Sequence, residues 1–197
     1  MLINSCMNVI IECRKGAIKM IELEEKMQIN MEDNIFISID VETTGLSPIY
    51  NELIEISAIK YNGQSKIDKF TTLIKPTTEI PQSITRITGI TNEMVSNSPS
   101  IEKVMPNLIE FIADYPIVAH NAKFDMGFLQ RYSDNSFIKN NIIDTVKISR
   151  NLYPELPNHK LGTVAKHIGI IEDGFHRAEF DCECCAKIYL EYVKKGG

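Results

Sequence analysis

Five residues in three short segments could together perform metal-dependent chemistry. Asp40 and Glu42 lie in the segment DVETTG, Asp125 ends HNAKFD, and His176 and Asp181 begin and end HRAEFD. Four carboxylates at one point repel one another, so a fold keeps them together when cations neutralise their charge. Two hard ions such as Mg²⁺ or Mn²⁺ suit this set and can clamp a phosphoryl group during its displacement. The set predicts metal-dependent cleavage of a phosphodiester.

The first pair of acids follows a short apolar run, residues 35–39, that is typical of a buried strand. Alternation along a strand puts Asp40 and Glu42 on the same face, where both carboxylates could reach one ion. Gly45 permits a tight turn and a close approach by a ligand. A solvated acidic turn after the strand is the alternative interpretation of this segment.

The second segment follows a short apolar stretch, residues 116–119, which we expect to form a parallel strand. We expect Asp125 in the helix after it. The alternative is an ordinary polar helix start, in which His120 and Asn121 act as caps and Asp125 is favoured near the helix N-terminus. We expect His120 itself to be structural.

The third segment places His176 and Asp181 five residues apart, or about 140° around an ideal helix. The pair works together more readily when His176 lies in the loop after Gly174 and Asp181 in the helix beyond. Asp181 could then bind metal while a neutral imidazole, a suitable base near pH 7, reaches the attacking water. A capping or surface histidine is the alternative for His176.

The remaining patterns predict the elements that position these segments. We expect strands at 53–61 and 66–75 joined by an Asn62-Gly63 turn, which with the first strand make an antiparallel meander. Two short helical turns should follow near Gly89, and a helix should open at Ser98-Pro99 with an apolar face through 101–112. Further expected elements are a helix at 124–132, a strand end at 142–145, and helices at 161–168 and 178–193. The fold class is α/β, a mixed sheet flanked by helices.

The length and composition of the chain limit the classes of protein to which it can belong. The chain has 197 residues, 44% hydrophobic and 24% charged, as expected for one globular domain. Residues 1–33 contain no motif, and we treat them as an unassigned extension before a domain at 34–197. No apolar run could span a membrane, and the start has no signal-peptide pattern, so we expect a cytoplasmic location. A net charge of −5 argues against a protein that coats nucleic acid.

Cysteine usage points to packing. Five cysteines form an odd set in a compartment that we expect to be reducing, so disulfides are not expected. Cys182 and Cys185 have C-x-x-C spacing, but no second pair of ligands accompanies them and they lie in a helical stretch. We interpret them as packing or surface thiols, with zinc or redox chemistry as the alternative.

Taken together, the three segments resemble the motifs of the DEDDh family of 3′→5′ exonucleases, which has a ribonuclease-H-like fold. The surrounding sequence is also similar, in PQSITRITGITNEM at 81–94, IDT at 143–145 and NHKLG at 158–162. Within that family the resemblance is greatest to proofreading epsilon subunits of bacterial DNA polymerase III and to the exonuclease domains of Gram-positive replicative polymerases. It extends from about residue 34 to residue 193.

The resemblance implies roles for the five residues. Asp40, Glu42 and Asp181 would hold the metal that carries the attacking water, and Asp40 would bridge to a second metal. Asp125 would hold the water shell of that second ion. His176 would deprotonate the attacking water, and a nucleoside 5′-monophosphate would leave.

The resemblance also implies substrate contacts. Thr43 would hydrogen-bond to the terminal nucleotide and Leu46 would pack on its base, while Asn121 and Phe124 would line the same pocket. For Leu46 and Phe124, ordinary core packing is the alternative. Three basic side chains could touch the substrate backbone or simply be solvated: Lys123, Lys160 and Arg177.

The expected function is a 3′→5′ exonuclease on the ends of single-stranded or frayed DNA, with a role in proofreading or repair. Nucleic acid 3′ ends are the expected partners, with a DNA polymerase subunit as the protein partner and no membrane. An exoribonuclease of the same family uses the same five residues and is the first alternative. A non-catalytic module that binds a polymerase is the second, although all five residues are present.

Overall fold

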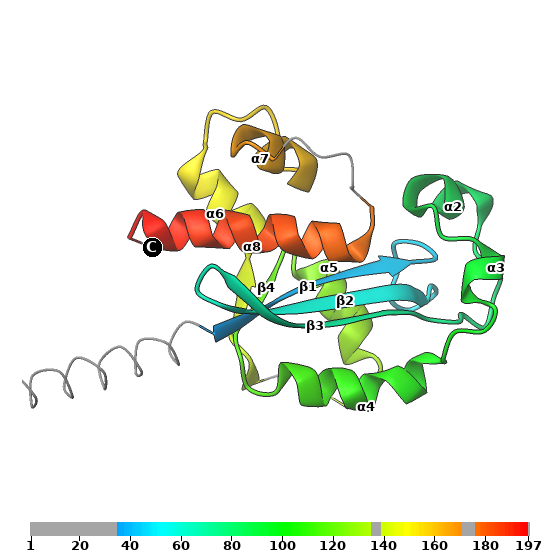
Figure 1. Cartoon of the computed structure of the whole chain (residues 1–197). Helices are drawn as coiled ribbons and strands as arrows, with labels where there is room; N and C mark the ends of the chain where they lie inside the picture. Colours follow the sequence, from blue (N-terminus) through cyan, green and yellow to red (C-terminus); the bar gives the residue numbers. More distant parts are fainter. Residues whose placement is uncertain (1–34, 135–138, 171–175, 197) are drawn as a thin grey trace, which may run out of the picture. The chain divides into compact units, whose positions relative to one another are not determined.

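A mixed five-stranded sheet forms the centre of the fold (Figure 1). The structure is a computed structural model that describes residues 35–134, 139–170 and 176–196. The strand order is β3-β2-β1-β4-β5. β2 and β3 are antiparallel, whereas β4 runs parallel to both β1 and β5. This sheet confirms the predicted fold class, and its strands are β1 (Ile35–Thr43), β2 (Leu53–Asn62), β3 (Ser65–Leu73), β4 (Ile117–Ala119) and β5 (Ile142–Asp144).

Helices fill the connections after β3 and complete the chain. Two short helices follow the third strand, and a longer one leads into β4. Within the described ranges, one helix lies between β4 and β5, and three more follow β5. The helices are α2 (Gln82–Thr88), α3 (Asn92–Val95), α4 (Ile101–Ile112), α5 (Lys123–Gln130), α6 (Thr145–Leu152), α7 (Leu161–His167) and α8 (Ala178–Lys194).

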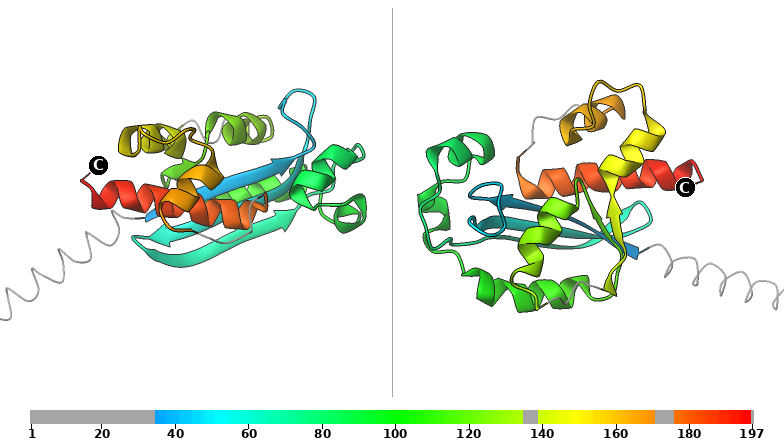
Figure 2. Two further views of the ribbon diagram at one scale, coloured as in Figure 1. Left: turned by 90° about the horizontal axis from the view of Figure 1, so that it is seen from above. Right: turned by 180° about the vertical axis from the view of Figure 1, so that it is seen from behind.

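The two faces of the sheet are covered by different helices (Figures 1 and 2). On β1, Ile37, Ile39 and Val41 face a core that includes apolar residues of α4 and α5. Phe36 points the other way and packs with residues of α8, and the Ser38 hydroxyl donates a hydrogen bond to a carbonyl of α8. Residues two apart share a face, so the alternation of β1 directs its even-numbered side chains toward α8.

The long helix α8 is tied to the sheet by packing and by ion pairs. Its cysteines Cys182 and Cys185 are buried against the sheet, and the Cys182 thiol donates to the carbonyl of Ser57 on β2. This burial supports the packing interpretation of the two thiols. At the exposed edge, β3 forms two ion pairs with α8, Lys66–Glu183 and Lys69–Glu179.

Several boundaries differ from those expected. The helix expected at Ser98-Pro99 begins at Ile101, because Ser98 still donates to the preceding turn and the Pro99 carbonyl accepts from the chain after β3. Helix α6 was not expected; Asp144 caps it by accepting from the N–H of Val146. The predicted extension at 1–33 lies outside the described residues. Among the residues that the structure describes, no helix is both long and apolar enough to cross a bilayer.

Candidate active site

The end of β1 carries Asp40 and Glu42 on the face that looks toward α8. Both side chains are partly buried. Ile39, which precedes Asp40, and Val41, which lies between the two acids, pack in the core on the opposite face of the sheet. Gly45 leaves room for a neighbour in the turn that follows, because a Cβ there would lie 2.7 Å from the side chain of Asn51 and would force it to move. Asn51 Oδ1 accepts the backbone N–H of Ser47 at 3.0 Å within this turn.

The first turn of α5 supplies Asp125. Its side chain is 2% exposed, and one carboxylate oxygen accepts the Val41 backbone N–H at 3.2 Å. The helix start is fixed by Asn121, which has a left-handed backbone (φ 62°) and donates its N–H to Asp144. Asp125 lies in the first turn of its helix, as in the alternative interpretation of an ordinary polar helix start. Its hydrogen bond to Val41 also holds it beside the end of β1, where Asp40 and Glu42 lie.

The start of α8 supplies His176 and Asp181. His176 lies two residues before the helix, is exposed, and has a left-handed backbone (φ 68°) that is rare for a residue with a side chain. Its N–H donates to Asp181 Oδ2 at 3.0 Å, across the first turn of the helix. This is the loop-then-helix placement that the five-residue spacing predicts.

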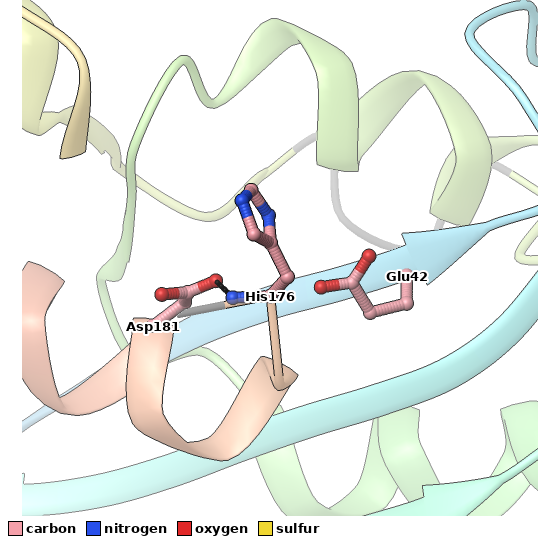
Figure 3. Close-up of side chains that lie close together, drawn as sticks. All are labelled: Glu42, His176 and Asp181. Atoms are coloured by element: carbon pink, nitrogen blue, oxygen red, sulfur yellow. Dashed lines mark hydrogen bonds between the residues drawn. The ribbon is translucent and has the colours of Figure 1, made fainter. Parts of the chain in front are cut away.

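The three segments meet at one point. Glu42, His176 and Asp181 each offer a possible ligand atom within 4.8 Å of the others (Figure 3). Asp40 and Asp125 lie outside this tight trio but close to it, since burial, followed by repulsion from Asp125 and Asp181, raises the pKa of Asp40. All five predicted residues are therefore gathered at the end of β1.

Burial and like charge both act on these carboxylates. Burial, followed by repulsion from Asp181 and Glu55, raises the pKa of Glu42 to about 8. Burial also raises the pKa of Asp125 to about 8, against the opposing effect of its backbone hydrogen bonds. The pKa of Asp181 rises to about 6, again chiefly through burial. Groups of this kind favour a bound cation, which would restore their ionised forms.

A single atom supports cation binding most directly. Among the described residues, Asp181 Oδ1 is the one buried side-chain oxygen or nitrogen without a hydrogen-bond partner. A buried carboxylate oxygen normally has a partner, since leaving it unpaired is costly. The donor set is mainly carboxylate oxygen, which suits hard divalent ions such as Mg²⁺ and Mn²⁺. These residues therefore fit a divalent metal.

The predicted substrate residues occupy different environments. Leu46 is 84% exposed, so the core-packing interpretation of this residue is wrong. Phe124 is partly buried and its ring lies against Phe128, so core packing does describe it. Thr43 is buried and its hydroxyl donates to the Gly45 carbonyl. Asn121 is exposed at the start of α5.

The basic residues also differ from one another. Lys160 helps to line a cavity of about 370 Å³ together with His176 and Asp181. Lys123 is exposed on α5. Arg177 is not simply solvated, since it forms an ion pair with Glu55 at 2.8 Å. His120 is held by Thr145 and by the carbonyl of His159, the structural placement that was expected.

Glu55 is the residue of this site that sequence reasoning missed. It lies on β2 and is 2% exposed, and its charge adds to the leading effect of burial in raising the pKa of Asp40, Glu42 and Asp181. The available signal was an acid within the apolar run LIEIS of a strand that we expected to be buried. A buried acid in such a run requires a partner, and Arg177 is that partner.

The sequence matches the model of a known protein family. The model of the family described as Exonuclease (RNase_T) matches residues 37–189. The chain belongs to this exonuclease family. The match covers all three segments and confirms both the predicted resemblance and the predicted enzyme class.

Curated relatives of this exonuclease-family chain are bacterial polymerases. It is 40% identical over 165 residues to the PolC-type DNA polymerase III of Clostridium perfringens, a match that covers 83% of this chain and 11% of that protein. It is 39% identical over 168 residues to the corresponding protein of Bacillus subtilis, covering 83% of this chain and 12% of the relative. The chain thus spans only about a tenth of the length of these relatives.

Solved structures share the exonuclease fold. Exonuclease X in complex with 5′-overhanging duplex DNA superposes with a TM-score of 0.68 at 26% identity, covering 82% of this chain and 93% of that one. The nuclease domain of 3′hExo, a DEDDh family member bound to rAMP, gives a TM-score of 0.69 at 21% identity over 83% and 93% of the two chains. These likenesses agree with the predicted ribonuclease-H-like architecture.

Proposed function

We propose that the chain is a two-metal 3′→5′ exonuclease that releases nucleoside 5′-monophosphates from single-stranded or frayed DNA ends. The observation that carries this proposal is the convergence of Glu42, His176 and Asp181 within 4.8 Å, with Asp181 Oδ1 buried and unpartnered. Membership of the exonuclease family supports the reaction type. The PolC-type polymerase relatives and the DNA in the exonuclease X complex support DNA as the substrate.

The proposed roles follow from where each group lies. Asp40, Glu42 and Asp181 would hold one cation, while Asp125 would support a second ion beside Asp40. When bound, these ions would neutralise the carboxylates and stabilise negative charge on the phosphoryl oxygens. The imidazole of His176, which is exposed, would take the proton of the water that attacks the phosphate.

The terminal nucleotide would lie beside the turn after β1. Leu46 projects into solvent and offers an apolar surface for an unstacked base. Thr43 and Asn121 would contribute polar contacts, and Phe124 would support the pocket from the core side. Lys160 borders the cavity beside His176 and Asp181, where it could approach a phosphate.

RNA is the second candidate substrate. A likeness to a 3′-exonuclease that recognises the 3′ end of a histone mRNA stem-loop motivates it, with a TM-score of 0.70 at 19% identity. The five proposed catalytic residues do not distinguish the two polymers, because the 2′-hydroxyl is sensed elsewhere. Proofreading or repair, a polymerase partner and a cytoplasmic location also stay predictions.

Digestion of end-labelled oligomers tests the proposal. The chain would be incubated with 3′-labelled and 5′-labelled single-stranded DNA, in Mg²⁺, Mn²⁺ or EDTA, beside Asp40→Ala and a matched RNA. We expect metal-dependent release of 3′-terminal mononucleotides from DNA, and none from the variant. Release from RNA alone would establish the exoribonuclease instead. Inactivity on both polymers would favour the non-catalytic module and overturn the proposal.

A further inference from the structure

We propose that Glu55 and Arg177 are positioning residues that hold His176 in place for the reaction. Neither residue belongs to the predicted set of five, and Glu55 approaches from β2, a strand that supplies none of them. The proposal rests on the nuclease function proposed above. In this proposal the Glu55–Arg177 ion pair, which joins β2 to the start of α8, raises the rate of the chemical step.

The pair is a clamp in which the Glu55 carboxylate is buried and the Arg177 side chain is half exposed. Glu55 is 2% exposed, and its two oxygens accept from Arg177 Nη2 at 2.8 Å and Nε at 3.3 Å. One of these oxygens also accepts the backbone N–H of Ala178 at 3.1 Å. A bidentate arginine–carboxylate contact is both strong and directional. The clamp therefore fixes the orientation of the chain as well as its distance from the sheet.

Glu55 also replaces a missing helix cap. Helix α8 begins at Ala178, and the side chain of the residue at its cap position, Arg177, makes no capping hydrogen bond. An arginine side chain has no acceptor with which to cap a helix. Glu55 supplies a carboxylate from another element and places its negative charge at the helix N-terminus, where it is favoured. The start of α8 is thus anchored to β2.

His176 is the residue that this anchor controls most directly. Its left-handed backbone (φ 68°) is unfavourable for an L residue and must be held by its surroundings. On one side its N–H donates to Asp181, and on the other side it is joined to the clamped Arg177. Releasing the clamp would let this backbone relax and would carry the imidazole away from Glu42.

If Glu55 and Arg177 acted only through their charges, the expected effects of substituting them would differ from those of a positioning role. The charge of Glu55 opposes ionisation of Glu42, whereas the charge of Arg177 favours it. Neutralising each residue in turn would then change metal affinity and rate in opposite directions. A positioning role predicts that both changes lower the rate, because either one opens the same clamp.

The exposed pair Lys69–Glu179 provides a matched control. It also links the sheet to the first turn of α8, with a separation of 2.7 Å, but both side chains are more than one-third exposed. Among the described residues, the Lys69 side chain hydrogen-bonds to Glu179 and to none of residues 176–178. Loss of this pair therefore removes an ion pair of α8 without releasing His176.

The experiment compares Glu55→Gln, Arg177→Gln, Arg177→Lys and Lys69→Gln in the full chain at saturating Mg²⁺. We expect both glutamine variants of the clamp to lower kcat by about 10- to 100-fold, with KM within about twofold. Arg177→Lys keeps the charge but loses the bidentate contact, so its kcat should fall between those of Arg177→Gln and wild type. Lys69→Gln should keep wild-type kcat.

Histidine side-chain NMR gives a readout that does not depend on activity. The chain has four histidines, and the His176 signals, assigned with His176→Ala, should shift in Arg177→Gln but not in Lys69→Gln. If Glu55→Gln does not fold, the two Arg177 variants carry the test. Unchanged kcat and unchanged His176 signals in an active protein would overturn the clamp, as would rate changes of opposite sign. An inactive wild type would instead reject the proposed function.

Discussion

Crowded, buried carboxylates should make the metal-free protein lose stability as the pH rises. Asp125 is the clearest group to test, because it is 2% exposed and burial raises its pKa from 3.8 to about 8. Asp125→Asn removes the ionisable group and keeps an oxygen that can accept the Val41 N–H. We therefore expect the variant to be more stable than wild type at pH 8 in EDTA.

The magnitude follows from proton linkage. Between pH 3.8 and 8 the folded carboxyl holds a proton that the unfolded chain has released, so the free energy of unfolding falls by about 1.4 kcal/mol for each pH unit. The whole interval sets an upper limit of about 6 kcal/mol. Water penetration and local relaxation reduce such penalties. We expect Asp125→Asn to gain ~2 kcal/mol at pH 8, and the gain to vanish toward pH 4.

Urea unfolding of both proteins at pH 5, 6.5 and 8, with EDTA or with Mn²⁺, measures this effect. Asp114→Asn, at an exposed position after α4, is the control and should match wild type throughout. Mn²⁺ should stabilise wild type more than Asp125→Asn, since the bound cation favours the ionised carboxylate. Equal stabilities of wild type and Asp125→Asn at pH 8 in EDTA, or a gain that grows as the pH falls, would refute the reasoning.

Three further predictions concern the proposed reaction. Asp181→Asn should lower the rate of metal-dependent cleavage by more than ~100-fold, because loss of a group that only supports a metal ligand already costs up to about that much. Circular dichroism should show that the variant still folds. His176→Ala should lower kcat by ~10²–10⁴ and keep Mn²⁺ affinity in a calorimetric titration; a collapse of affinity would make His176 a ligand. Leu46→Ala should raise KM for single-stranded DNA about fivefold, the equivalent of about 1 kcal/mol of apolar contact, and leave thermal stability unchanged because Leu46 is exposed.

The sequence predicted those elements whose signals are local. Alternation in β1 located Asp40 and Glu42 on one face, and the five-residue spacing placed His176 before α8 and Asp181 within it. Helix α6 was missed because its start depends on a cap by Asp144, a residue that we assigned only to the end of a strand. The start of α4 was placed too early, because Ser98 bonds to the turn before it rather than to the helix.

Side-chain environments were harder to predict because they depend on tertiary contacts. Leu46 and Phe124 are both apolar residues beside a motif, yet one projects into solvent and the other packs against Phe128. Arg177 gave no sign in the sequence of its partner, since Glu55 is 122 residues earlier. Pattern reasoning recognises which residues could do chemistry, but not which distant residue supports them.

The position of the site follows from the strand order. β1 and β4 are parallel neighbours, and after them the chain departs toward opposite sides of the sheet, to β2 and to α5 and β5. Such a divergence favours a ligand site beyond the carboxyl ends of the two strands. Asp40 and Glu42 come from the end of β1 and Asp125 from the helix after β4. Only α8 comes from elsewhere in the chain. This helix carries Asp181 and is preceded by His176, and the ion pair between buried Glu55 and Arg177 anchors its start.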